Sequence, residues 1–171
     1  MEQNNFTIGG CAKLSAAIID ATREDYIASL KWLKKNEQEC LKVSKVCAKW
    51  FKWEDSKKAS KEASEWLKQY KHIIAKPLEE CSYKEEKWKV RNEEKIKKYQ
   101  ADVQKFATMK KPHKPSDKTL NMYKRYIRET TCKNECEVFY RSERYKKLTM
   151  YLGIPGEEVI RTLKGQVYGT H

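Results

Sequence analysis

No glycine occurs between Cys11 and Leu152 in this chain of 171 residues. Glycine takes positive φ more readily than any other residue, so a stretch this long without it has few ways to form β-hairpin turns or phosphate-cradling loops. Proline, which stops or starts helices, punctuates the chain at Pro77, Pro112, Pro115 and Pro155. The sequence therefore predicts an all-α fold.

Apolar residues recur at helical spacing in several segments. The predicted helices cover 12–35, about 37–53, 56–74, about 78–109, a stretch from 116 or 117 to about 148, and 157–164. Asp55 or Ser56 is expected to cap the third helix after a break at 54–56, and Pro77 to occupy the first position of the fourth. The chain after Gly165 is expected to fray.

The fourth predicted helix is about 45–50 Å long at 1.5 Å per residue and needs a partner alongside. A short connector, Lys110 to Pro115, joins it to a fifth helix of similar length, which indicates a long antiparallel helical hairpin. The predicted architecture is one domain. Residues 12–53 and 136–165 form a small helical bundle, and residues 56–135 form a helical insertion or arm.

Asp25 falls within an apolar stripe of the first predicted helix, between Ala21 and Ala28. A carboxylate buried there would be costly without a partner. A structural role beside an arginine or a helix N-terminus is therefore expected ahead of a catalytic role.

Lysine and arginine outnumber aspartate and glutamate by 37 to 24, a formal net charge of +13. Such an excess favours polyanionic partners, although interleaved glutamates, as in Lys84-Glu85-Glu86-Lys87, also fit a solvated face with ion pairs. The candidate nucleic-acid or polyanion surface covers the connector and the fifth helix. Its residues are Lys110, Lys111, Lys114, Lys118, Lys124, Arg125, Arg128, Lys133, Arg141, Arg144, Lys146 and Lys147. Trp50, Phe51 and Trp53 either stack on bases or belong to the core.

The residue content argues against an enzyme. Only three histidines occur, and no glycine-rich phosphate loop or HExxH or GxSxG motif is present, so no catalytic residue, cofactor or metal site is expected. Four cysteines could meet around a metal if their helices packed together: Cys40, Cys47, Cys132 and Cys136. Buried reduced thiols are the alternative, because zinc sites use a tighter CxxC spacing.

No apolar run reaches the length of a membrane span, and residues 1–15 lack the pattern of a signal peptide. No membrane partner is therefore expected, and the cytoplasm of the host cell is the expected location. The cysteines are then expected to be reduced.

Two separated stretches, LSAAIIDATREDYIASLKWLKKN (14–36) and CEVFYRSERYKKLTMYLGIPGEEVIRTLK (136–164), resemble the two halves of a group of short phage-encoded helical proteins with no established function. The matching positions are Ala17, Ile18, Ile19, Ala21, Asp25, Tyr26, Phe139, Tyr140, Ser142, Tyr145, Leu148, Thr149, Gly156, Glu157, Ile160 and Leu163. Residues 37–135 would be an insertion, and Arg144 stands where the group tends to carry an aromatic residue. The resemblance implies a phage origin, a bacterial host and a core built from both chain ends. If the halves pack together, Asp25 is expected to pair with Arg141 or Arg144.

The function expected from these features is that of a phage-encoded, non-enzymatic helical protein. Its basic surface would act on a nucleic acid or a host nucleoprotein, and an anti-CRISPR inhibitor of bacterial defence is the most concrete form. One alternative is an oligomeric structural, assembly or protein-interaction protein, which an uncovered apolar stripe would support. Another is a helical sponge for a signalling nucleotide, which requires a concave basic pocket.

Overall fold

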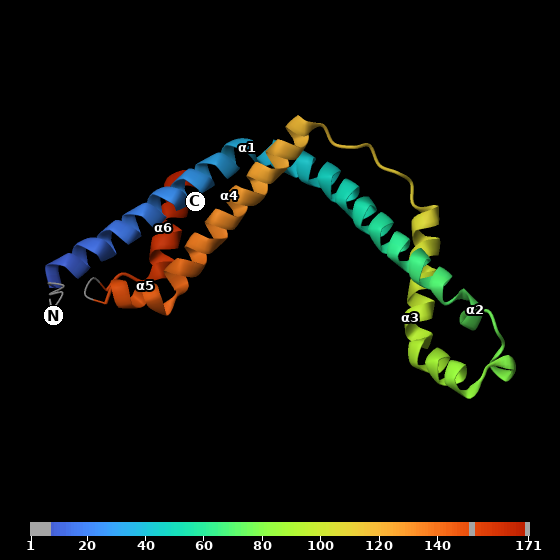
Figure 1. The fold of residues 1–171 in the computed structure, drawn as a ribbon. Helices are drawn as coiled ribbons and strands as arrows, with labels where there is room; N and C mark the ends of the chain where they lie inside the picture. Colours follow the sequence, from blue (N-terminus) through green and yellow to red (C-terminus); the bar gives the residue numbers. More distant parts are fainter. Residues whose placement is uncertain (1–7, 151–152, 170–171) are drawn as a thin grey trace, which may run out of the picture. The chain divides into compact units, whose positions relative to one another are not determined.

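The computed structural model describes residues 8–150 and 153–169, and every regular element within them is helical. The prediction of an all-α fold is confirmed. The elements, shown in Figure 1, are α1 (Ile8–Gln69), α2 (Lys71–Ile74), the 3-10 helix η1 (Leu78–Glu80), α3 (Tyr83–Thr108), α4 (Asp117–Arg141), α5 (Glu143–Leu148) and α6 (Gly156–Tyr168). The signal-peptide expectation concerns residues 1–15, of which 1–7 lie outside the described residues.

The chain forms two compact units. We call the first the terminal unit, built from the chain up to Ser44 and from Asp117 onward, and the second the central unit, Lys45–Ser116. Helix α1 contributes to both. The structure therefore moves both predicted boundaries, because 45–53 belong to the central unit and 117–135 to the terminal unit.

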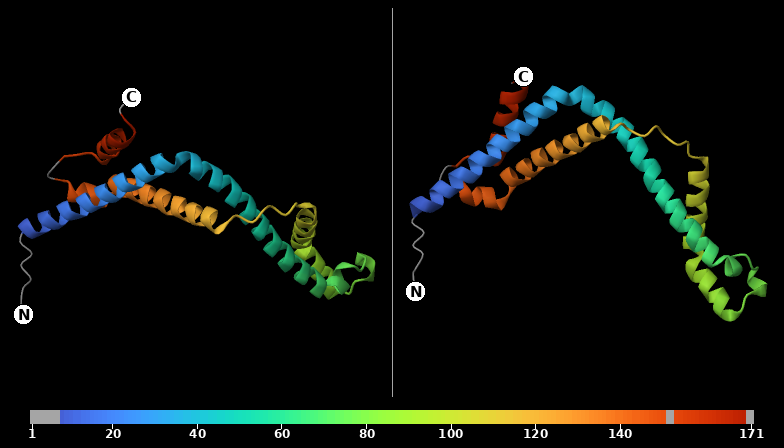
Figure 2. Two further views of the ribbon diagram at one scale, coloured as in Figure 1. Left: turned by 90° about the horizontal axis from the view of Figure 1, so that it is seen from above. Right: turned by 45° about the horizontal axis from the view of Figure 1, so that its top comes forward.

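The core of the terminal unit joins α1 to the last three helices. Its buried residues are Tyr26, Leu30, Cys136, Tyr140, Tyr145, Ile160, Leu163 and Val167. Helix α4 runs antiparallel to the first part of α1, since Tyr26 contacts Tyr140 while Trp32, further along α1, lies under Arg125. Both views in Figure 2 show these two helices side by side.

The central unit is a two-helix hairpin in which α3 packs antiparallel to the second part of α1. Ring contacts fix the pairing, with Trp53 next to Phe106 at 5.8 Å and Tyr70 next to Trp88 at 4.7 Å between centroids. No side chain of α3 is fully buried. With only two main helices, the unit leaves most of its aromatic residues partly exposed, and Trp53 is the buried exception among those described.

An antiparallel helical hairpin is present as predicted, but it is not formed by the fourth and fifth predicted helices. These helices correspond to α3 and α4, which belong to different units, and each pairs with a different part of α1. A 62-residue helix offers each of them a partner over its length. The short connector is therefore not the turn of a hairpin.

The predicted breaks near residue 36 and at 54–56 are also wrong, because α1 continues through both. The side-chain amide of Asn36 donates a hydrogen bond to the carbonyl of Trp32 at 2.8 Å. The polar side chain of Asn36 therefore finds a partner within the continuous helix. Trp53, Ser60 and Ala63 are buried on one face that spans the second predicted break. Continuous packing outweighs the capping preference of Asp55 and Ser56.

Helix α3 begins five residues later than expected. Pro77 precedes the 3-10 helix, and Ser82 caps α3 instead. Its hydroxyl accepts from the Glu85 amide at 3.4 Å, and its own amide donates to the Glu85 carboxylate at 2.9 Å. This capping box satisfies two of the amides that the start of any helix leaves without intrahelical partners, whereas Pro77 provides no side-chain acceptor for them.

The fifth predicted helix is divided at Ser142. The hydroxyl of Ser142 accepts from the amide of Tyr145 at 3.1 Å and caps α5, while it donates to the carbonyl of Phe139 at 2.6 Å. At the other end, α6 extends to Tyr168 and buries Val167. The expected fraying after Gly165 is therefore wrong for residues 166–168.

Asp25 is exposed, whereas its neighbour Tyr26 is fully buried. No salt bridge among the described residues joins Asp25 to Arg141 or Arg144, although Asp25 and Arg144 line the same shallow depression. The expected buried carboxylate is wrong, because the face of α1 that meets α4 is the one that contains Tyr26 and Leu30.

Candidate nucleic-acid interface

The twelve predicted basic residues are divided between the two units. Lys110, Lys111 and Lys114 lie in the central unit, and the other nine lie on α4 and α5 of the terminal unit. All are exposed except Lys133, which is half-buried. Exposure alone does not make these side chains available to bind phosphate, because several of them form ion pairs with carboxylates.

Two of the arginines on α4 converge on one carboxylate. Arg128 bonds Glu129 at 2.7 Å, and the Arg125 side chain lies 3.8 Å from the same group. Hydrogen bonding from Arg128 lowers the pKa of Glu129, and Ser29 of α1 also donates to it at 3.0 Å. These two arginines are therefore part of the contact between α1 and α4.

Arg141 belongs to a second network, centred on Glu137. It bonds Glu137 at 3.4 Å and Glu157 of α6 at 2.5 Å. Glu137 also accepts from the Tyr26 hydroxyl at 2.9 Å and from Lys164 at 3.0 Å. Burial acts to raise the pKa of Glu137, but these hydrogen bonds lower it below its ordinary value overall. Arg141 therefore stabilises the fold, as does Glu137.

Replacing Glu137 by glutamine should lower the free energy of unfolding by about 1–2 kcal/mol at pH 7, because the Glu137 carboxylate receives several charge-assisted hydrogen bonds. The expected loss is no larger because solvent screens the exposed cations that donate some of these bonds. Because the pKa of Glu137 is lowered in the folded protein, this stabilisation is fully present above the ordinary glutamate pKa of about 4.3 and is lost progressively as the pH falls from there through the folded pKa. Urea unfolding at pH 7 and pH 3.5 measures both. The exposed Glu135→Gln variant should match wild type, and an equal loss at both pH values would contradict the assignment.

The other residues of the predicted set are less constrained. Lys146 bonds Glu143 at 2.5 Å, and Lys111 lies over the Trp53 ring at 5.6 Å. Lys118, Lys124 and Lys147 form no ion pair within the described part of the chain. The predicted surface is thus less available for phosphate than its residue count indicates.

A stronger basic surface lies on α3 and is absent from the predicted set. We call it the basic row: Lys84, Lys87, Arg91, Lys95, Lys98 and Lys105. At 3.6 residues per turn these positions fall within about a quarter of the helix circumference and span about 32 Å. All six are exposed, and none forms a salt bridge among the residues described.

The acidic residues of α3 lie mainly away from this row. Glu85 is held by Ser82 and by Lys76 at 3.1 Å, and Glu93 bonds Lys97 on the opposite flank at 2.5 Å. Asp102 shares the flank of the row, and Glu94 lies at its edge. Charges that alternate in the sequence are thereby separated on the helix surface.

The net charge of the two units is also unequal. The central unit has 20 Lys and Arg against 11 Asp and Glu, a net charge of +9, whereas the rest of the chain has 17 against 13, a net charge of +4. Most of the positive charge therefore belongs to the unit that contains α3.

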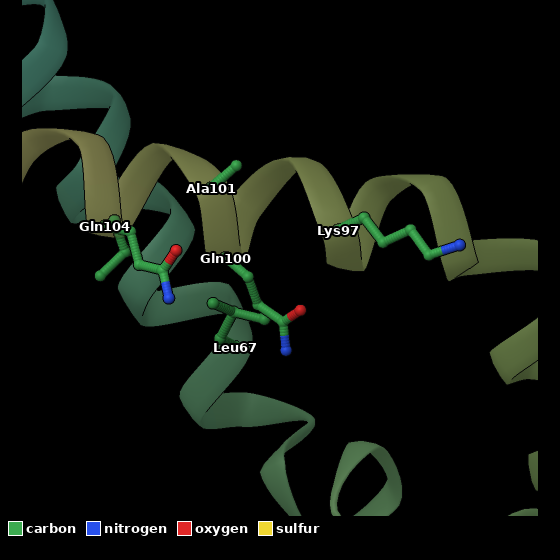
Figure 3. Close-up of a pocket in the computed structure, with 6 residues that line it drawn as sticks. Leu67, Lys97, Gln100, Ala101 and Gln104 are labelled. Carbon is green, nitrogen blue, oxygen red and sulfur yellow. The ribbon is translucent and has the colours of Figure 1, made fainter.

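A different set of residues lines the opposite flank of α3. A depression there is lined by Leu67 of α1 and by Lys97, Gln100, Ala101, Val103 and Gln104 of α3. Figure 3 shows Gln100 and Gln104 beside Leu67, with Lys97 extending along α3 away from them. Since Lys97 already bonds Glu93, this depression is poorly suited to an anion.

The aromatic residues at 50–53 divide between the two alternatives. Trp53 is buried against Phe106 and Trp50, so it belongs to the core, and Trp50 is half-buried beside it. Phe51 is 42 % exposed. Phe51 is therefore the most exposed of the three side chains.

The cysteines form no metal site within the described residues. Cys40, Cys132 and Cys136 belong to the terminal unit and Cys47 to the central unit. Burial is the main cause that raises the pKa of the Cys136 thiol to about 12, with Cys132 adding to it. Burial raises the pKa values of Cys40 and Cys47 as well. These features fit buried, protonated thiols.

Comparison with known protein families, with curated proteins and with solved structures finds no match for the chain. None of the helices described is both long and apolar enough to cross a membrane. The expected likeness to phage-encoded proteins stays a prediction. Several of its matching positions, among them Tyr26, Tyr140 and Ile160, are core residues of the terminal unit.

Proposed function

We propose that this protein is a non-enzymatic binding protein whose basic row on α3 contacts the phosphate backbone of a nucleic acid, free or within a nucleoprotein. The observation that supports the proposal is the arrangement of six exposed cations without carboxylate partners along one flank of one helix. Phosphates can be bound by such point charges without sequence readout.

A charge-removal experiment tests this proposal. The variant K84Q/R91Q/K98Q removes three cations from the basic row, and the matched control K118Q/K124Q/K147Q removes three exposed, unpaired lysines from the terminal unit. Binding to single-stranded and duplex oligonucleotides is measured between about 50 and 200 mM salt. Loss of three phosphate contacts should reduce the slope of log K against log salt by about 2–3.

The control variant should keep a slope close to that of wild type. Equal slopes for wild type and the α3 variant would overturn the proposal for this surface. A large reduction of the slope in the control variant alone would instead favour the α4 and α5 residues predicted from the sequence as the phosphate-binding surface. Absence of any binding at low salt would remove nucleic acid as the partner.

The narrower form of the proposal is that a phage-encoded protein inhibits a bacterial defence complex, and it rests on the resemblance of the chain ends. Expression in a host with active CRISPR immunity should then restore plaque formation by a targeted phage. The α3 triple variant should lose this effect while accumulating to the same level. Unchanged plaque numbers with wild type would reject inhibition of the CRISPR system tested.

A second candidate function is self-association, which the half-buried aromatic residues of the central unit favour. No side chain of α3 is fully buried, and Tyr83 and Val90 are 69 % and 65 % exposed. Against this, a net charge of +9 on each central unit opposes the approach of a second copy. Light scattering that gives the mass of one chain at every concentration would exclude it.

The nucleotide-sponge alternative has less support. Four depressions that lie among the described residues are each lined by only one or two basic side chains. A pocket for several phosphates normally brings more cations together.

A further inference from the structure

Four aromatic rings form a continuous cluster between α1 and α3 in the central unit. Trp66 stacks on Trp88 with centroids 5.6 Å apart and an interplanar angle of 17°. Tyr99 meets Trp66 edge-on at 5.2 Å, and Tyr70 lies 4.7 Å from Trp88. All four are half-buried rather than enclosed, so the cluster reaches the surface.

A residue of the basic row covers this cluster. The Lys95 ammonium lies over the Trp66 ring at 4.7 Å and over the Tyr99 ring at 5.5 Å from the centroids. A single exposed lysine side chain, and not a packed helix, therefore lies over these two rings. Lys95 itself belongs to the basic row, so the covered rings lie within reach of one of its cations.

We propose that the central unit binds single-stranded nucleic acid, with a base stacked on Trp66 and its edge against Tyr99, in place of the Lys95 ammonium, and with the backbone following the basic row. This inference rests on the proposed function. A cation over an exposed ring is held more weakly than a stacked base, so the base displaces it. The freed ammonium then reaches a phosphate. A duplex offers only its phosphates, because its bases already stack on each other.

Three ligands of equal length test the inference: a single strand, the same strand with abasic sites, and a duplex. The abasic strand keeps the phosphates but cannot stack. We expect the single strand to bind wild type about tenfold or more tightly than the abasic strand, since each stacked base has a large effect. Equal affinity for single and abasic strands would overturn the inference and leave the proposed function standing. No binding of any ligand would overturn both.

Tryptophan fluorescence locates the stacked base. Binding of the single strand should quench the emission, and the conservative variant Trp66→Phe should lose much of this quenching while it retains the fold by circular dichroism. Trp32→Phe is the matched control, because Trp32 lies under Arg125 in the terminal unit. Quenching that Trp32→Phe removes and Trp66→Phe retains would contradict the inference.

Discussion

Replacing Tyr140 by alanine should lower the free energy of unfolding of the terminal unit by about 3–5 kcal/mol, the range for truncating a buried aromatic residue. The ring is 1 % exposed and contacts three others, Tyr26 at 6.1 Å, Phe139 at 5.7 Å and Tyr145 at 5.3 Å between centroids. Alanine would leave a cavity among helices α1, α4 and α5. Urea denaturation followed by circular dichroism measures the loss.

Tyr140→Phe is the matched control, since the Tyr140 hydroxyl is buried and has no hydrogen-bond partner among the described residues. Removing an unsatisfied hydroxyl should leave the stability unchanged or raise it by about 1 kcal/mol. Burial raises the pKa of Tyr140 to about 12. The stability that the neutral Tyr140 side chain contributes is therefore intact below about pH 10 and declines as the pH rises toward 12. A loss below about 1 kcal/mol in Tyr140→Ala would contradict the assigned core.

Replacing Gly156 by alanine should destabilise the terminal unit by about 3 kcal/mol, the upper part of the range for overpacking. A methyl group at Gly156 would overlap the backbone carbonyl of Tyr140. Backbone cannot rotate away as a flexible side chain can. Helix α6 would therefore have to move from the end of α4, which weakens the packing of Ile160 and Leu163.

The same denaturation experiment measures the Gly156 effect. Glu158→Ala provides the control, because Glu158 is exposed two residues further along α6 and its replacement should change the stability by less than about 0.5 kcal/mol. Equal stability of Gly156→Ala and wild type would show that α6 does not approach α4 as closely as the structure has it.

The helical segments could be predicted from the absence of glycine, but their ends could only partly be predicted. Ser82 with Glu85 is a capping box visible in the sequence, and it outranks Pro77 as a helix start because it satisfies more amides. Asp55 and Ser56 look equally suited to a cap, yet α1 continues through them. Ser82 caps a helix and Asp55 and Ser56 do not because of tertiary packing, which local sequence preference does not predict.

The choice of buried face had a similar limit. The first part of α1 carries two apolar stripes, one through Ala21 and Ala28 and the other through Tyr26 and Leu30. Periodicity identifies both, but only the position of α4 decides that Tyr26 and Leu30 are buried. For this reason the sequence predicts a buried Asp25, whereas the structure exposes it. Likewise, nothing local to α3 reveals that its partner is α1 and not α4.

The basic row is hard to recognise in the sequence because lysine and glutamate alternate along α3. Projection of residues 84–105 on a helical wheel would have revealed it, since Lys84, Arg91 and Lys98 fall on one flank and Glu93 on the other. In contrast, Ser29 of α1 bonds Glu129, the partner of Arg128, and Glu157 of α6 bonds Arg141. These contacts between helices cannot be predicted without the fold.

Because the terminal unit is assembled from both ends of the chain, it must be completed late during synthesis. Asp117, the first residue of α4, follows Leu30 by 87 residues, 72 of which form the central unit. At 5–20 residues per second this interval lasts about 4–17 s. The whole central unit is synthesised in that time and can fold. Until α4 emerges, the apolar face of the first part of α1 is exposed and accessible to chaperones.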